Sequence, residues 1–298
     1  MRYALSAHGL KRLREWMRNR PLLAFDIDGT LAPIVTRPWN ARVPDAVQRH
    51  LAMLAEWTSV AIVTGRAVAD AQSMLAFHPR YLIGNHGADG VPGFEGAAAA
   101  FARTCRTWLD QVGAAGEAWR DLRGVTLEDK TYSLAFHFRH VRVPARVQAL
   151  LEQRVARLVP RPTLMHGKRV LNLIPPGAPD KGDALQALLE HSRCDRALYV
   201  GDDASDEAVF RLRLPAVLTV RIERHRGSAA DLYLRQQGEI ARLVPELARM
   251  CLEPGGLGER RRQEGPGLSA KPPLNPRRRW SPGPLSVRRA RFRPRRGP

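Results

Sequence analysis

The stretch that decides the fold is Leu22-Leu23-Ala24-Phe25-Asp26-Ile27-Asp28-Gly29-Thr30-Leu31. Four apolar residues lead directly into Asp26, and Asp28 follows two positions later. A short, bounded apolar run predicts a strand that is buried on both faces. Asp26 then lies at the carboxyl end of this strand, which is the edge of an open α/β sheet where ligands bind. Two carboxylates this close together need a cation if they are buried, so the stretch indicates a site for a hard metal ion.

An isolated Asp-x-Asp pair is more often a solvated acidic turn, but the flanking strand and Gly29-Thr30 favour the site, and the rest of the chain supports it. Strand-like and helix-like segments alternate along most of the chain, which predicts an α/β protein with a doubly wound parallel sheet. Between them lies a block with an Ala-rich helix and strand-like alternation, which predicts an inserted α+β cap domain. The expected bounds are 1–91 and 177–254 for the two parts of the core domain, 92–176 for the cap domain and 255–298 for a basic tail.

Individual elements follow from apolar spacing. Strands are expected at 22–25, 60–63, 81–83, 197–200 and 217–220 in the core, and within 124–141 and at 169–174 in the cap. Helices are expected at 8–17, after Pro44, and at 67–75, 95–112, 147–158, 182–189, 206–212 and 239–252. The segment Ser228-Ala229-Ala230-Asp231 resembles a capping box, which predicts a helix start.

Composition excludes several classes of protein. The three cysteines, Cys105, Cys194 and Cys251, are far apart and form no Cys-x-x-Cys pair, which argues against a disulfide framework and a zinc cluster. The basic, amphipathic first 20 residues lack the apolar core of a signal peptide. No apolar run is long enough to span a bilayer. We therefore expect a cytoplasmic protein without a transmembrane segment.

The net charge of +19 is concentrated in the last 44 residues. This tail holds 13 Lys and Arg against two Glu, and 15 of its residues are Gly or Pro. Such a composition cannot bury enough apolar surface to fold, so disorder is expected. One interpretation is an electrostatic arm for weak contact with nucleic acid or an anionic surface. The other, which we favour, is a dispensable extension.

Polar residues follow the expected strands at positions that a parallel sheet brings to one edge. They are Asp26, Asp28, Thr64, Lys181, Asp202, Asp203 and Asp206. Together they resemble the haloacid dehalogenase superfamily of phosphotransferases, over roughly residues 21–250. The pairing of Asp26-x-Asp28-Gly29-Thr30 with Gly201-Asp202-Asp203 carries this resemblance.

The resemblance implies a catalytic role for four residues. Asp26 would attack phosphorus and form an aspartyl-phosphate. Asp28 would protonate the leaving oxygen and later deprotonate the attacking water. Thr64 would donate a hydrogen bond to a phosphoryl oxygen. Lys181 would neutralise the charge between Asp26 and the phosphate.

It also implies a magnesium site. Asp202 would bind Mg²⁺ together with Asp26 and the main-chain carbonyl of Asp28. Mg²⁺ prefers few carboxylates and keeps several waters. Asp203 and Asp206 would therefore act mainly through water or from behind the direct ligands. The expected metal-site residues are Asp26, Asp28, Asp202 and Asp206.

Residues 127–139 narrow the resemblance, because they are similar to the cap signature of trehalose-6-phosphate phosphatases. Residues 201–207, Gly84-Asn85-His86-Gly87 and Asp180-Lys181-Gly182 also fit this family. Taken alone, the charges at 128–130 more often belong to a solvated hairpin. The substrate-binding residues expected from the resemblance are Asp26, Ile27, Asp28, Arg66, Asn85, His86, Glu128, Lys130, Arg139, Lys168 and Asn172.

One position departs from the family. The strand after Lys168 carries Asn172 where the family has a Glu that is expected to accept from sugar hydroxyls. Asn172 can still accept and donate hydrogen bonds, but it carries no charge. The departure concerns the identity of the sugar and leaves the phosphoryl chemistry untouched.

The expected function is therefore Mg²⁺-dependent hydrolysis of trehalose 6-phosphate to trehalose and phosphate, a step of trehalose biosynthesis. One alternative is a phosphatase of sucrose phosphate or a glucosylglycerol-type phosphate. Another is a non-catalytic protein that binds a sugar phosphate. The Asp26 and Asp28 pair argues against the last, because a sensor need not retain the Asp28 acid.

Overall fold

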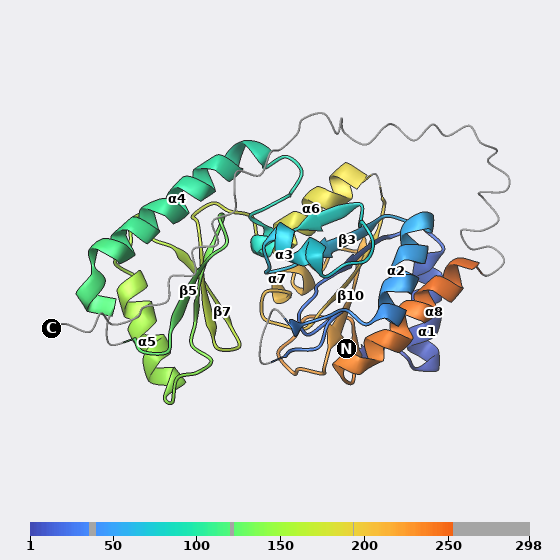
Figure 1. Ribbon diagram of the computed structural model, residues 1–298. Helices are drawn as coiled ribbons and strands as arrows, with labels where there is room; N and C mark the ends of the chain where they lie inside the picture. Colours follow the sequence, from blue (N-terminus) through green and yellow to red (C-terminus); the bar gives the residue numbers. More distant parts are fainter. Residues whose placement is uncertain (36–39, 120–121, 193, 253–298) are drawn as a thin grey trace.

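The computed structural model describes residues 1–35, 40–119, 122–192 and 194–252 (Figure 1). Two β-sheets lie side by side in separate bodies, each covered by helices. The larger sheet has seven strands in the order β1-β11-β10-β9-β2-β3-β4, all parallel. The smaller sheet is antiparallel, in the order β5-β6-β8-β7. This arrangement confirms the expected doubly wound core with an α+β cap. The expected tail lies outside the described residues.

The core elements follow one another in βα order. The strands of the large sheet are β1 (Arg2–Tyr3), β2 (Leu22–Phe25), β3 (Val60–Val63), β4 (Tyr81–Ile83), β9 (Ala197–Gly201), β10 (Val217–Ile222) and β11 (Leu232–Leu234). The helices are α1 (Ala7–Met17), α2 (Asp45–Trp57), α3 (Val68–Ser73), α6 (Lys181–Ser192), α7 (Glu207–Phe210) and α8 (Ile240–Leu252). Short 3₁₀ turns are η2 (Asn85–Gly87) and η4 (Gln237–Glu239).

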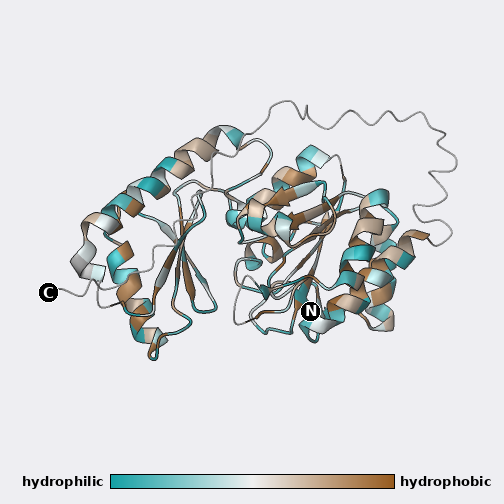
Figure 2. Cartoon of the chain, in the orientation of Figure 1, coloured by the Kyte–Doolittle hydropathy of each residue, from teal (hydrophilic) through white to brown (hydrophobic). Residues whose placement is uncertain are grey.

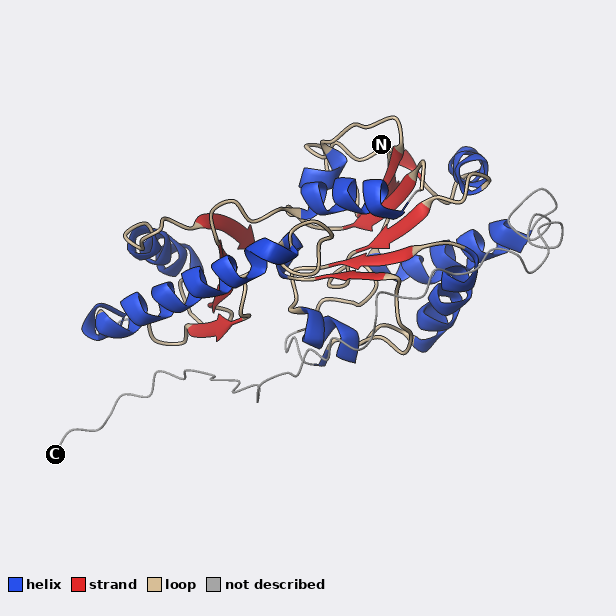
Figure 3. Ribbon diagram, turned by 90° about the horizontal axis from the view of Figure 1, so that it is seen from above, coloured by secondary structure: helices blue, strands red, loops and turns tan. Residues whose placement is uncertain are grey.

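Strand β2 lies in the middle of the large sheet and is buried on both faces. Leu23 and Phe25 pack on one side, in the cluster that includes α1, α2 and α8. Leu22 and Ala24 pack on the other side, in the cluster that includes α6 and α7. Alternate side chains of a strand point to opposite faces, so a continuous apolar run is what a strand between two helix layers requires. Figure 3 shows these helices on both sides of the sheet.

The cap elements are separate from those of the core. They are α4 (Glu95–Ala114), η3 (Gly116–Trp119), β5 (Thr126–Asp129), β6 (Leu134–His137), α5 (Pro144–Val155), β7 (Thr163–Gly167) and β8 (Val170–Ile174). One face of the cap sheet packs on α4 and α5, with Trp108, Phe136 and Leu171 in the shared core. The opposite face carries Glu128, Ala135 and Asn172, which are neighbours across three strands. The polar positions of the cap sheet therefore share one face.

Three strands have no counterpart in the prediction, namely β1, β7 and β11. The predicted helix start at Ser228 is wrong, because the chain enters β11 there. Asp231 accepts hydrogen bonds from the Thr219 amide and hydroxyl, and from Arg12. The capping pattern is local, and here the Leu-Tyr-Leu alternation paired with β10 prevails over it.

Hydropathy follows the layers. The strands of the large sheet are largely apolar, those of the cap sheet mix apolar and polar residues, and the helices carry polar residues on their outer faces (Figure 2). This is the pattern of helices that bury one stripe against a sheet. Within the described ranges, no helix has the length and apolar character needed to cross a membrane.

Candidate active site

The carboxyl edge of the large sheet gathers the predicted polar residues. The chain enters the sheet's centre at β2, moves outward to β3 and β4, and returns beside β2 at β9. The edge next to β2 is therefore the point where the strand order reverses, and ligands bind at such points. Asp26 follows β2, Thr64 follows β3 and Asp202 follows β9. The predicted gathering of these residues at one edge is thus present in the structure.

Lys181 links the buried acids of this edge. It begins α6, and its Nζ lies 3.0 Å from Asp26 Oδ1 and 2.7 Å from Asp206 Oδ1. The Lys181 side chain is 1% exposed, so water does not screen these ion pairs. A single buried cation thus lies between two buried carboxylates.

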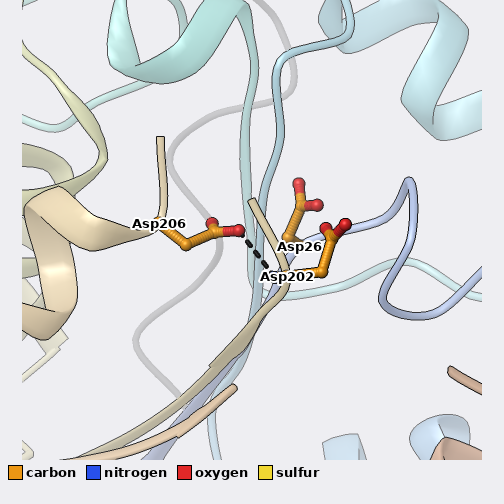
Figure 4. Close-up of side chains that lie close together, drawn as sticks. All are labelled: Asp26, Asp202 and Asp206. Carbon is orange, nitrogen blue, oxygen red and sulfur yellow. Dashed lines mark hydrogen bonds between the residues drawn. The ribbon is translucent and has the colours of Figure 1, made fainter. Parts of the chain in front are cut away.

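Asp206 is fully buried and accepts four hydrogen bonds. Its Oδ1 receives Lys181 Nζ and the Tyr199 hydroxyl, each at 2.7 Å. Its Oδ2 receives the main-chain amides of Asp202 and Asp203, at 2.8 and 2.9 Å (Figure 4). A carboxylate has about four acceptor positions, so those of Asp206 are used within the protein. Asp206 thereby holds the turn that presents Asp202.

Burial and mutual repulsion shift the pKa values of these acids. Burial raises the pKa of Asp26 well above its usual range, and Lys181 offsets only part of this. Burial, together with the charges of Asp206 and Asp203, raises the pKa of Asp202 to about 7. Asp203 behaves differently: although burial opposes ionisation, the Lys181 charge and the Ser205 hydrogen bond lower its pKa to about 2. Burial also raises the pKa of Asp206, so Asp26, Asp202 and Asp206 together lack sufficient positive charge around them.

A divalent cation fits this arrangement. Carboxylate oxygens of Asp26, Asp202 and Asp206 lie within 4.8 Å of one another (Figure 4). Oxygen ligands from carboxylates are those that Mg²⁺ prefers. Gly29 has a positive φ of 86°, and a Cβ there would meet Asp202 Oδ2 at 2.1 Å. Only glycine therefore allows the Asp202 carboxylate to approach the loop after β2 so closely.

The raised pKa of Asp202 leads to a prediction for chelated protein. Its folded pKa of about 7 exceeds the ordinary value of 3.8, so protonation of Asp202 stabilises the fold. This contribution is complete below about pH 4 and is lost as the pH rises through about 7. In EDTA, the free energy of unfolding should therefore fall across this window, and fall less in Asp202→Asn. Urea unfolding at several pH values measures both slopes; equal slopes would contradict the prediction.

Asp28 and Arg66 form a bidentate ion pair. Arg66 Nε and one Nη each lie 2.6 Å from an Asp28 carboxylate oxygen. The Asp28 carboxylate is 41% exposed and the Arg66 side chain 14%. Thr64, which is fully buried, accepts the Arg66 main-chain amide at 3.3 Å through its hydroxyl. The loop after β3 therefore carries both a hydroxyl and a guanidinium to the edge where Asp26 lies.

The predicted cap residues occupy different environments. Glu128 pairs with His137 at 2.6 Å. Although burial opposes ionisation, the His137 hydrogen bond and the charges of Lys130, His137 and Arg66 lower the Glu128 pKa to about 2. Arg139 donates to the Val35 main-chain oxygen at 2.9 Å, which joins cap to core. Lys168 lies exposed in the turn between β7 and β8.

His86 and Asn172 are both buried where the core meets the cap. His86 is 8% exposed and Asn172 4%. Among the described residues, His86 Nδ1 and Asn172 Oδ1 are buried and have no partner at full hydrogen-bond geometry. Burial and the charges of Lys130 and Lys181 lower the His86 pKa to about 3, although hydrogen bonding to the Asn172 side chain opposes this, so the ring is neutral near neutral pH. Two neighbouring neutral groups thus lie buried in this region.

Sequence reasoning missed two residues of this region. Tyr199 donates to Asp206, and Ser133 donates to Asn85. Only Tyr199 carries a sequence signal, because its hydroxyl is the polar exception in an apolar strand. A buried tyrosine hydroxyl usually finds a hydrogen-bond partner.

Known proteins resemble this chain in sequence and in fold. A probable trehalose-phosphate phosphatase of Oryza sativa subsp. japonica is 30% identical over 65% of this chain and 56% of its own length. An uncharacterised glycosyl hydrolase of Mycobacterium tuberculosis is 29% identical over 77% of this chain, which spans only 18% of that protein. The chain thus spans less than two thirds of either relative.

Among solved structures, the C-terminal domain of Candida albicans trehalose-6-phosphate phosphatase has a TM-score of 0.64 at 18% identity, covering 84% of this chain and 98% of that one. A trehalose-6-phosphate phosphatase related protein has a TM-score of 0.61 at 22% identity, covering 77% and 98%. These likenesses support the fold. The model of the trehalose-phosphatase family matches residues 24–231, most of the described chain. The chain therefore belongs to the trehalose-phosphatase family.

Proposed function

We propose that this chain is a Mg²⁺-dependent phosphatase that hydrolyses trehalose 6-phosphate to trehalose and phosphate, with an aspartyl-phosphate on Asp26. The observation that carries the proposal is the buried Lys181, with Nζ 3.0 Å from Asp26 Oδ1 at the edge that faces the cap. A nucleophilic carboxylate must approach an anionic phosphate, and a fixed cation beside it removes much of that repulsion. The names of the plant relatives support the same substrate.

In the proposed reaction, Asp26 attacks phosphorus and the bond between phosphorus and the sugar oxygen breaks. Water then attacks phosphorus and releases phosphate and Asp26. Lys181 holds the Asp26 carboxylate in position, and the Thr64 hydroxyl donates to a phosphoryl oxygen. Both side chains are buried, so little reorganisation is needed as charge develops.

Asp28 is the proposed acid and base. It gives a proton to the sugar oxygen and later takes one from the attacking water. Both of its oxygens now receive N–H groups from Arg66. A phosphate dianion competes for the same guanidinium, since arginine binds phosphate and carboxylate in the same bidentate manner. Substrate binding would therefore draw Arg66 toward the phosphate and free Asp28 for proton transfer.

Asp26 and Asp202 are the proposed direct carboxylate ligands of Mg²⁺, with the main-chain carbonyl of Asp28. Asp206 supports them from behind, because its oxygens already accept four hydrogen bonds. When bound, Mg²⁺ would supply positive charge that stabilises the phosphoryl oxygens.

The cap is proposed to bind the sugar through the face that carries Glu128 and Asn172. A sugar hydroxyl can donate to one group and accept from another. Asn172 Oδ1 and the neutral His86, which lie next to each other, offer such groups. We further propose the domain bounds 1–91, 92–176 and 177–254. Both domain boundaries then fall in loops, one before α4 and one between β8 and α6.

A second candidate is hydrolysis of another sugar phosphate, of the sucrose phosphate or glucosylglycerol phosphate type. Asn172 favours it, because this buried position is neutral where the family has a carboxylate. The change leaves Lys181, Asp26 and Thr64 untouched. The two candidates therefore differ in sugar and share the chemistry.

A panel of sugar phosphates tests the proposal. With Mg²⁺, phosphate release from trehalose 6-phosphate should exceed release from sucrose phosphate and glucosylglycerol phosphate. EDTA should stop the reaction, and added Mg²⁺ should restore it. A preference for another sugar phosphate would replace the trehalose assignment. EDTA-insensitive turnover, or none on any substrate, would overturn the proposed chemistry.

A further inference from the structure

The turn between β5 and β6 of the cap is hydrogen-bonded to the core domain. This turn, residues 130–133, contacts the core at Asn85 and at Gly65. Ser133 Oγ donates to Asn85 Oδ1 at 2.7 Å, and Asn85 Nδ2 donates to the Lys130 main-chain oxygen at 3.3 Å. Lys130 Nζ donates to the Gly65 main-chain oxygen at 2.9 Å. Three hydrogen bonds thus join one cap turn to two core loops.

The Asn85 side chain is buried, and both its amide oxygen and its amide nitrogen bond to the cap turn. Asn85 and Ser133 are both 0% exposed. The two ends of the Asn85 amide serve the cap turn, and the same side chain also stabilises the Asp89 carboxylate. With no exposed surface and both ends of its amide bonded to the cap turn, Asn85 is therefore placed to act on the reaction through the cap.

The backbone of the core loop is strained in support of this contact. Asn85 has φ of 52° and His86 of 60°, and Thr131 in the cap turn has φ of 73°. Residues other than glycine adopt such values seldom, and they persist where surrounding contacts enforce them. A Cβ added to Gly87 would lie only 2.5 Å from the Asp180 main-chain oxygen, so the two segments are in close contact. The same loop thus contacts the connection by which the chain returns from the cap.

We propose that Asn85 and the Gly65 carbonyl form a socket for the cap turn 130–133, and that this socket holds the cap closed over the catalytic edge. Asn85 and Ser133 are positioning residues in this assignment. Glu128 lies two residues before Lys130, and Arg66 directly follows Gly65. Docking of the turn therefore fixes the distance between a sugar-facing carboxylate and the loop that carries Thr64 and Arg66.

The expected effect of the socket on catalysis rests on the proposed function. A sugar phosphate needs the cap, whereas a small aryl phosphate needs only the core edge. Loss of the socket should therefore reduce selectivity for the sugar phosphate and leave the chemistry on phosphorus unchanged.

Ser133→Ala tests the socket with the smallest change, because it removes one hydroxyl. Ser73→Ala is the matched control, since the Ser73 hydroxyl bonds only within α3. Amide hydrogen exchange followed by mass spectrometry measures opening of the turn directly. We expect exchange in a peptide that covers 130–133 to become roughly tenfold faster in Ser133→Ala, with no change in Ser73→Ala. Asn85→Gly tolerates the positive φ at this position and should also speed exchange in the same peptide. Exchange in the double variant Ser133→Ala/Asn85→Gly should be little faster than in either single variant.

Kinetics provides the second measurement. In Ser133→Ala, kcat/KM for trehalose 6-phosphate should fall roughly tenfold, with kcat/KM for p-nitrophenyl phosphate unchanged. An equal fall for both substrates would show general structural damage and overturn the socket. Unchanged exchange in 130–133 would also overturn it. If neither compound is hydrolysed by the unmodified chain, the proposed function fails, and hydrogen exchange still decides the socket.

Discussion

Replacing Asp26 by Asn is expected to abolish phosphate release while the protein stays folded. An amide is too weak a nucleophile to form the aspartyl-phosphate, and loss of a covalent nucleophile typically costs about 10⁵-fold or more in rate. Asn has nearly the volume of Asp, and Lys181 keeps its bond to Asp206 at 2.7 Å. Phosphate release under saturating substrate and Mg²⁺ measures the loss, and thermal unfolding verifies the fold.

The control for this variant is Asp45→Asn, which changes an exposed acid at the start of α2. It should keep full activity. Acid quenching during turnover, followed by intact-mass measurement, should show a phosphorylated fraction in the unmodified chain and none in Asp26→Asn. Turnover in Asp26→Asn within tenfold of the unmodified chain would rule out Asp26 as the nucleophile.

Replacing Lys181 by Met should damage both stability and catalysis. The change leaves Asp26 and Asp206 buried together without their shared cation. Removing one partner from a buried ion pair typically costs about 3–5 kcal/mol. We expect a loss of this size in the free energy of unfolding at neutral pH in EDTA. Turnover should fall by at least about 10³-fold, because an anion then approaches an uncompensated carboxylate.

Two further variants separate these effects. Lys11→Met changes an exposed lysine on α1 and should leave stability and turnover unchanged. The double variant Lys181→Met/Asp206→Asn removes one of the two uncompensated charges, so it should regain part of the stability and none of the activity. Urea unfolding and phosphate release measure the two quantities. Stability of Lys181→Met within about 1 kcal/mol of the unmodified chain would contradict this account of the buried cation.

The core sheet was predictable because its strands carry their signal locally. Residues 22–25 are apolar at every position, and such a run suits only a strand with helices on both faces. Short edge strands lack this signal. The two-residue β1 and the three-residue β11 depend on pairing with each other and with β10, which no local pattern reveals. The wrong prediction of a helix start at Ser228 has the same origin, because a capping pattern is local and contains nothing of the pairing between β11 and β10.

The phosphoryl end of the site was predictable for a related reason. The carboxyl ends of parallel strands lie at one edge of a sheet. Asp26, Thr64 and Asp202 therefore come close together independently of the conformation of the segments that connect these strands. Lys181 was expected beside Asp26, but the Tyr199 partner of Asp206 was not predictable. Tyr199 reaches Asp206 only because β9 and the start of α7 fold back on each other.

The sequence by itself determined the fold class, the family, and the residues available for chemistry at the sheet edge, because these depend on local patterns and on the geometry of parallel strands. Only the tertiary structure decided how those residues are used. Arg66 clamps Asp28 across 38 positions, Ser133 meets Asn85 across 48, and Lys130 meets Gly65 across 65. The first contact depends on how two loops of the core sheet meet, and the last two depend on how cap and core approach each other. The approach of cap and core involves hydrogen bonds between residues far apart in the sequence, which no short segment of the chain contains.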